Sequence, residues 1–311
     1  MNCSILVGSL MLALVLPASA MAQLSPAWMI PAAAHNRGVS PTFWMTDVNL
    51  HNPHSYDLPV VVQLLPSNRD NQEVPTRYVR VEARHTVNLW DALGNEFGWY
   101  GTGAILVTVD GSLISCDTKA VCDFLVTSRT YTLDPVTVSG EFGQAMPGVS
   151  VYDGLDWNGY AYAAGVMNDG VDFRCNPGVA SWTADWVTVQ MDVKDADGTI
   201  LDTEVFDVPP FGHLQRRMRT PVSGGSVAFH VVDGPEDTLV FPYVTVVNQS
   251  TGDPTFVPTW VSEVGVTVAS VSPGGFVLRG VPLPADGGKR ISREQLAQRS
   301  RSRSADGQPA Q

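Results

Sequence analysis

The best candidate for a metal site in the sequence lies around the Asp-Gly pair at residues 197–198. Asp195, Asp197 and Glu204 occupy positions three, five and twelve of a calcium-binding loop, from which such loops supply oxygen ligands. Position one should also carry a carboxylate, but it is Val193. Asp-Gly is also one of the strongest signals for a β-hairpin turn. The stretch therefore predicts a hairpin, and we expect no metal ligands here.

Two histidines and one serine are the other side chains whose spacing resembles a catalytic or metal site. His51 and His54 have the spacing of some zinc ligands, but they flank a proline turn and no glutamate lies between them to act as a base. Ser150 follows Gly148 as in G-x-S-x-G, but Tyr152 stands where the closing glycine should be. No P-loop or dinucleotide-binding fingerprint is present. We expect no catalytic residue, no metal and no cofactor.

Arg129 is the most informative charged residue. Strand alternation over residues 125–132 places it on the face shared by Leu125 and Tyr131. If that face is the core, the guanidinium needs a polar partner, because an unpaired buried charge is costly. We expect Asp47 or His35 to lie beside Arg129 in a structural polar cluster. The alternative is that Arg129 binds an anion.

Aromatic side chains are the remaining candidates for ligand contact. The chain has 8 Trp and 8 Tyr, and most such residues fill sandwich cores and cap their ends. Trp99, Tyr100 and Trp157 lie beside glycines in expected turns, so they are the best candidates for exposed rings that stack on a sugar.

The elements that must position these residues are β-strands. Residues 187–194 alternate strictly between apolar and polar side chains, as a half-buried strand does. Turn signals recur along the chain, and only residues 87–98 have helical spacing, which predicts a short capping helix or turn. The pattern predicts an all-β fold of immunoglobulin-like antiparallel sandwiches.

The chain also contains an internal repeat. Residues 101–147 and 224–258 share the order of glycine entry, apolar strand, Asp-Gly turn, second apolar strand and proline-terminated exit. We expect two tandem sandwiches, at 23–148 and 149–262. In the second, residues 159–169 are expected to match Leu50 to Pro53, and 171–182 to be an insertion.

The two ends of the chain have their own character. Residues 1–22 carry an apolar run and end in Ala20-Met21-Ala22, which predicts a signal peptide cleaved before Gln23. The run is too short to span a membrane, so no stable insertion is expected after cleavage. Beyond the sandwiches we expect an extra β segment at 263–283 and a disordered basic tail at 284–311.

Export would place the cysteines in an oxidising compartment. Cys116 and Cys122 bracket a short insertion between two strands, where a hairpin would bring them within bonding distance, so we predict a disulfide between them. Cys175 is then left over, either buried and unreactive or available for intermolecular pairing. The formal net charge of −12 argues against a nucleic-acid surface.

Several motifs resemble those of a group of secreted bacterial proteins to which no biochemical role is assigned. The motifs are PAAAH at 31–35, FWMTDVNLHNP at 43–53, TSRTYT at 127–132, GEFGQAMPG at 140–148 and STGDPTFVP at 250–258. The resemblance covers roughly residues 30 to 260, and it implies an extracellular location and tandem β-sandwich-like repeats. It brings no catalytic residues with it, and the insertions around the three cysteines depart from the plain pattern.

From the sequence we therefore expect a secreted or periplasmic, non-catalytic interaction or scaffold protein whose partner is an extracellular protein or polysaccharide. One alternative is a carbohydrate-binding module that uses exposed aromatics. Another is an extracellular hydrolase with a site between the repeats.

Overall fold

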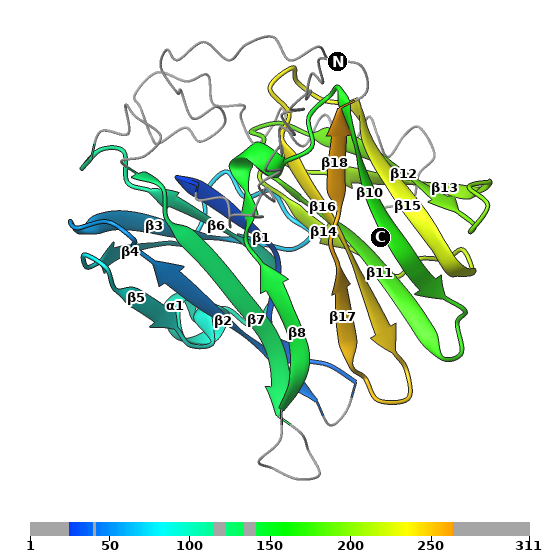
Figure 1. Ribbon diagram of the computed structural model, residues 1–311, viewed down its shortest axis with the longest axis horizontal. Coiled ribbons are helices and arrows are strands. Elements are labelled where there is room, and N and C mark those ends of the chain that lie inside the picture. The colour runs from blue at the N-terminus through cyan, green and yellow to red at the C-terminus, as the bar shows by residue number, and fades with distance from the viewer. Residues whose placement is uncertain (1–24, 40–41, 115–121, 134–140, 264–311) are drawn as a thin grey trace, which may run out of the picture.

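The computed structural model describes residues 25–39, 42–114, 122–133 and 141–263. Within these ranges nearly every element is a β-strand in an antiparallel sheet (Figure 1). The predicted all-β fold of two tandem sandwiches is confirmed. The predicted signal peptide, the basic tail, Cys116 and the extra segment beyond Glu263 lie outside the described residues.

The first sandwich contains β1 (Ala27–Arg37), β2 (Phe43–His51), β3 (Leu58–Pro66), β4 (Thr76–Val81), β5 (Thr86–Leu89), α1 (Ala92–Phe97), β6 (Gly101–Val109), β7 (Leu125–Leu133) and β8 (Glu141–Pro147). One layer has the order β4-β3-β6-β1, and β5, β2, β7 and β8 form the other. β1 pairs with both layers, and its register shifts between Ile30 and Ala33, where Pro31 has no N–H to donate. Of the short helix or turn expected within residues 87–98, the structure shows the helix, α1.

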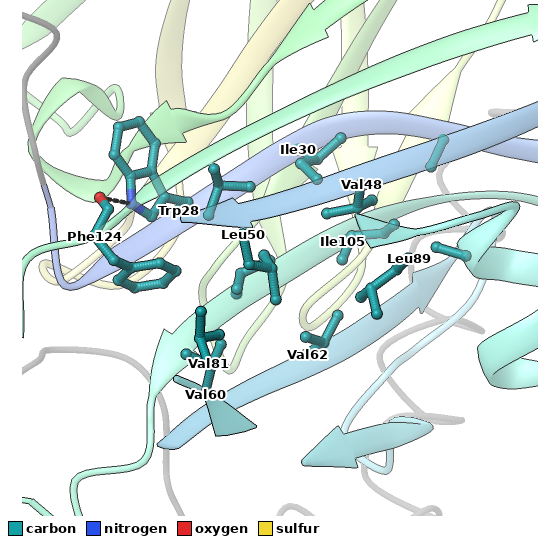
Figure 2. Packing of buried hydrophobic residues seen from close by; sticks show 14 of the residues in the cluster. Trp28, Ile30, Val48, Leu50, Val60, Val62, Val81, Leu89, Ile105 and Phe124 are labelled. Carbon is teal, nitrogen blue, oxygen red and sulfur yellow. Dashed lines mark hydrogen bonds between the residues drawn. The ribbon is translucent and has the colours of Figure 1, made fainter. Parts of the chain in front are cut away.

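The first core fills the space between these two layers (Figure 2). Alternate apolar side chains point into it from facing strands, among them Trp28, Ile30, Val48, Leu50, Val60, Val62, Val81, Leu89, Ile105 and Phe124. The indole Nε1 of Trp28 donates to the carbonyls of Ser25 and Phe124, each at 3.0 Å. The one polar atom of this large ring is therefore satisfied inside an apolar layer.

The second sandwich contains η1 (Val151–Asp153), β10 (Gly159–Asn168), β11 (Phe173–Ser181), β12 (Val187–Lys194), β13 (Ile200–Val208), β14 (His213–Gln215), β15 (Val222–Asp233), β16 (Val240–Asn248), β17 (Pro254–Val257) and β18 (Trp260–Glu263). Its layers have the orders β13-β12-β15-β10-β18 and β14-β11-β16-β17. Cys175 is a free thiol in the core between them, where burial raises its pKa to about 12. At neutral pH it is protonated and shielded, which suits the inert alternative.

The strand pairing of the first sandwich recurs in the second. Pairs β1–β6, β2–β5, β2–β7, β3–β4, β3–β6 and β7–β8 correspond in order to β10–β15, β11–β14, β11–β16, β12–β13, β12–β15 and β16–β17. The short strand β9 (Val149–Ser150) pairs with β1 as β18 pairs with β10. One strand plan is thus used twice, which supports a duplication.

The start of the second copy differs from the prediction. β10 takes the place of β1, so the expected match of residues 159–169 with Leu50 to Pro53 is wrong. That match relied on a strand ending in Asn before a turn, and such ends recur in many strands. The expected insertion at 171–182 is also wrong, because most of it forms β11, which pairs with β14 and β16. Pro177 and Gly178 hide this strand in the sequence.

A third apolar layer joins the two sandwiches. It lies between the β4-β3-β6-β1 layer and the β14-β11-β16-β17 layer, and its buried members are Ala27, Met29, Leu65, Ala104, Leu106, Ala180, Trp182, Phe211 and Phe241. β1 and β6 are therefore buried on both faces, which explains why residues 104–107 form an unbroken apolar run. The structure therefore has three apolar interiors, one within each sandwich and one between them.

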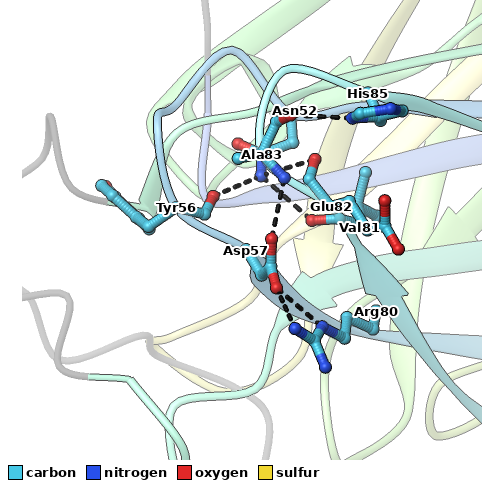
Figure 3. Close-up of polar contacts among 8 residues, drawn as sticks. All are labelled: Asn52, Tyr56, Asp57, Arg80, Val81, Glu82, Ala83 and His85. Atoms are coloured by element: carbon cyan, nitrogen blue, oxygen red, sulfur yellow. Dashed lines mark hydrogen bonds and ion pairs between the residues drawn. The ribbon is translucent and has the colours of Figure 1, made fainter.

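The corner after β2 is held by one buried amide. Nδ2 of Asn52, a fully buried residue, donates to the carbonyl oxygens of Tyr56 at 2.7 Å, Val81 at 3.0 Å and Glu82 at 3.2 Å (Figure 3). Asp57 fastens the same corner by accepting from the Ala83 N–H at 2.9 Å and from Arg80, whose hydrogen bond lowers the pKa of the Asp57 carboxyl. Asn52, which follows β2 in the predicted Asn52-Pro53 turn, thus has a structural role.

Replacing Asn52 by Ala should lower the free energy of unfolding by about 1–3 kcal/mol, because three carbonyl oxygens lose their donor in a site without free access to water. Urea unfolding followed by tryptophan fluorescence measures this loss. The matched control is Asn49→Ala on β2, where the amide reaches only an exposed Thr127 hydroxyl at 3.3 Å. Equal stability of the two variants would contradict the structural role of Asn52.

Candidate functional site

The predicted polar cluster lies on the outer face of the first sandwich. Asp47 and Arg129 are direct cross-strand partners on β2 and β7. The face that Arg129 shares with Leu125 and Tyr131 is the outer one and not the core, since the Arg129 side chain is 45% exposed and the buried face of β7 is the other one. That buried face carries Val126, Ser128, Thr130 and Thr132. Hydroxyl groups that bond within the sheet made it look polar in sequence.

Arg129 and Asp47 have different partners within the cluster. Arg129 extends over the Tyr131 ring, 4.9 Å from its centroid, and its Nη1 donates to Glu141 at 2.6 Å. Asp47 accepts from the Asp91 N–H at 2.8 Å and from the Tyr131 hydroxyl at 3.4 Å. Burial raises the pKa of Asp47 despite these hydrogen bonds. Arg129 and Asp47 therefore belong to one network without a direct ion pair.

His35 joins the same network through the start of α1. Its Nδ1 lies 2.9 Å from Oδ1 of Asp91, the residue whose N–H Asp47 accepts. Asp91 has φ 45° and ψ 59°, a left-handed conformation that a non-glycine residue adopts at a cost. A Cβ on Gly94 would lie 2.5 Å from the His35 ring, so α1 rests against that ring. The cluster therefore holds α1 on the sheet.

The three predicted stacking residues do not form one surface. Trp99 packs against the first core. Tyr100 is 61% exposed and accepts a hydrogen bond from the Arg37 N–H at 3.3 Å. Trp157 belongs to the second sandwich, where its Nε1 donates to the carbonyl of Pro235. Of the three, Tyr100 presents the most open ring.

The side chains discounted as metal ligands have local partners. Asp195 accepts from the N–H groups of Asp197 and Thr199, as expected of a hairpin turn. His51 bonds the Thr86 hydroxyl, and His54 bonds a backbone carbonyl. In the part of the chain that the structure describes, no group of three or more potential ligands gathers around one point.

A cleft with polar walls lies between the two sandwiches. The hydrolase alternative placed a site at this junction, but the sequence did not identify the residues that line it. The volume of the cleft is about 250 Å³. β1, β2, β7 and β8 line one side, and β11, β14, β16 and β17 line the other. Its walls meet only when the two sandwiches pack together, because one wall comes from residues 32–146 and the other from residues 174–254.

The wall of the cleft contains a serine–histidine contact. Nδ1 of His213 lies 2.7 Å from the Ser67 hydroxyl, and its Nε2 lies 2.8 Å from the Tyr243 hydroxyl. Ser67 also bonds the Thr102 hydroxyl at 2.7 Å. His213 is buried, which lowers its pKa to about 3. With both ring nitrogens engaged and the ring neutral, the histidine ties the two sandwiches together and is poorly placed to accept a substrate proton.

The charged side chains that line the cleft are all positive. Arg37 and Arg174 line it, and no Asp or Glu is among the described residues of its wall. Neither guanidinium has a carboxylate within 4 Å among the residues described. Burial and the neighbouring Arg217 lower the pKa of Arg174. The Oε1 atom of Gln144 is buried there and has no hydrogen-bond partner in the described structure.

Comparison with known proteins adds little. No family model matches the chain, and no curated protein matches it. One solved structure that matches is a β-glucuronidase 2 of Bacteroides uniformis covalently bound to cyclophellitol-6-carboxylate aziridine, at 10% identity and a TM-score of 0.18. The match covers 76% of this chain, which spans about a quarter (26%) of that one. A similarity this low carries no argument.

Acid should destabilise the protein through His213. Its pKa is near 6.5 when unfolded and about 3 when folded, so below pH 6.5 the unfolded state binds the extra proton. The stabilisation is fully present above pH 6.5 and is lost as the pH falls toward 3, at up to about 1.4 kcal/mol per pH unit. Urea unfolding at pH 7, 6, 5 and 4 measures it, and His213→Gln should show a shallower slope. If the free energy of unfolding fell equally with pH in the parent protein and in His213→Gln, His213 would not be the source of the acid sensitivity.

Proposed function

We propose that the protein is a secreted, non-catalytic interaction or scaffold protein. The observation that carries this proposal is that the side chains with catalytic chemistry are used to join elements. His213 and Ser67 connect the two sandwiches, and Asp91 and Asp47 hold α1 on the sheet. A buried, neutral imidazole with both ring nitrogens engaged serves to join the elements and is poorly placed to exchange a proton with a substrate.

The stacked architecture also suits a scaffold. A shared apolar layer, rather than a flexible linker, sets the position of one sandwich against the other. Binding surfaces on such a body lose little conformational freedom when a partner binds, which favours affinity. In the described residues, no helix is both long and apolar enough to cross a membrane.

Export rests on the apolar N-terminal stretch and can be tested directly. Expressed in full in a bacterium that exports proteins, the chain should be recovered outside the cytoplasm with Gln23 as its first residue, as intact mass would show. The control, Leu12→Asp with Leu14→Asp, should remain in the cytoplasm because it interrupts the apolar run. Recovery of both proteins in the cytoplasm with Met1 intact would contradict export.

Peptide mapping of the exported protein without reduction tests the proposed Cys116–Cys122 disulfide. The linked peptide is expected, while Cys175 should react with an alkylating reagent only after denaturation, because it is buried. A bridge that includes Cys175 would overturn the assignment.

Carbohydrate binding is the second candidate function, favoured by aromatic rings on the outer face of the second sandwich. We name Tyr160, Tyr162, His230 and Trp260 the aromatic row. The Tyr160 and Tyr162 rings are stacked with centroids 6.0 Å apart, and His230 lies 5.0 Å from Tyr160. Trp260 is 74% exposed and pairs with Tyr162 across β18 and β10. Rings exposed along one sheet face are suited to stacking on a polysaccharide.

Pull-down on insoluble polysaccharides tests this candidate. Tyr162→Ala and Trp260→Ala should each reduce the bound fraction several-fold, because each removes one face on which a sugar ring can stack. Trp157→Ala is the control, since the indole Nε1 of that residue donates to the Pro235 carbonyl and its ring takes no part in the ring contacts of the aromatic row. Unchanged retention of the two row variants on every polysaccharide that binds the parent protein would contradict the assignment.

A further inference from the structure

The cleft between the sandwiches is held open from both sides. The shared apolar layer fixes one side. On the other, Phe256 of β17 packs against the first core. Because both contacts join the two sandwiches, the cleft does not close without unpacking one of them. A water molecule occupies about 30 Å³ in the liquid. The cleft volume of about 250 Å³ therefore has room for one small ligand.

The two arginines of the cleft lack the carboxylate partner that three other described arginines have. Arg80, Arg129 and Arg216 each pair with a carboxylate. Arg37 and Arg174 face the cleft without one among the described residues, although the protein carries a net charge of −12. Arg174 is half-buried, and a partly desolvated guanidinium is stabilised by an anion.

Neutral polar groups surround this charge. Asn36, Asn176, Gln144 and Gln215 all line the cleft and offer amide donors and acceptors. Amide oxygens need donors, which an oxyanion does not provide and a hydroxyl group does. The site therefore matches a molecule that carries both a carboxylate and several hydroxyls.

We infer that the cleft binds an acidic sugar, with Arg37 and Arg174 on its carboxylate and the surrounding amides on its hydroxyls. The inference rests on the proposed function as a binding protein and names its ligand class. Since the residues come from both sandwiches, neither sandwich alone would form the site.

Isothermal titration calorimetry on the full chain tests the inference with galacturonate, galactose and sulfate as probes. Galacturonate should bind at least about tenfold more tightly than either of the others, since only it offers both chemistries. Arg174→Ala should weaken galacturonate binding by about 10- to 100-fold, as expected for a charged hydrogen bond. Arg80→Ala, which removes an arginine outside the cleft, should leave binding unchanged.

A second substitution shows whether lost binding comes from misfolding. Arg37 is exposed, so Arg37→Ala should weaken galacturonate binding while the thermal unfolding midpoint stays unchanged. Equal binding of galactose and galacturonate, equal binding of sulfate and galacturonate, or no binding of any probe would each overturn the inference. Retention on a polysaccharide or protein partner in those cases would leave the proposed function standing. Turnover of a substrate would instead overturn the proposed function.

Discussion

The apolar layer between the two sandwiches is the contact on which the rest of the structure depends. It buries the second face of β1 and β6 against β11 and β16, so the central strands have no wet side. Trp182, Phe211 and Phe241 fill it with large rings. A sandwich separated from its neighbour would expose these rings to water, and burial of that much apolar area favours the stacked arrangement strongly.

Polar contacts at the edge of this layer set the exact placement of the halves. Apolar contact is non-directional, so it brings the halves together without choosing one orientation. The hydrogen bond between His213 and Ser67, and the one from Asn71 to the Phe211 carbonyl at 2.9 Å, are directional and join the two sandwiches. The cleft exists beside them because the walls are held apart at both sides.

The local features of the fold follow from short stretches of sequence. The hairpin at Asp195–Gly198, the strict alternation of β12 and the short helix α1 were all predictable, because turn chemistry and side-chain period act between near neighbours. The fold class follows from the same signals. The face of β7 that is buried was not predictable, since Thr130 and Thr132 are buried through hydroxyl bonds that only their partners supply.

The amino-acid sequence thus determined an all-β chain, its duplicated plan and the residues of its turns, all of which depend on local patterns. The tertiary structure decided which sheet faces are buried twice, that Asp91 and not Arg129 is the partner of Asp47 and His35, and that Arg37 and Arg174 share a cleft. These outcomes depend on contacts between residues far apart in the chain. No local period or spacing encodes such contacts, because they arise only when the two sandwiches pack against each other.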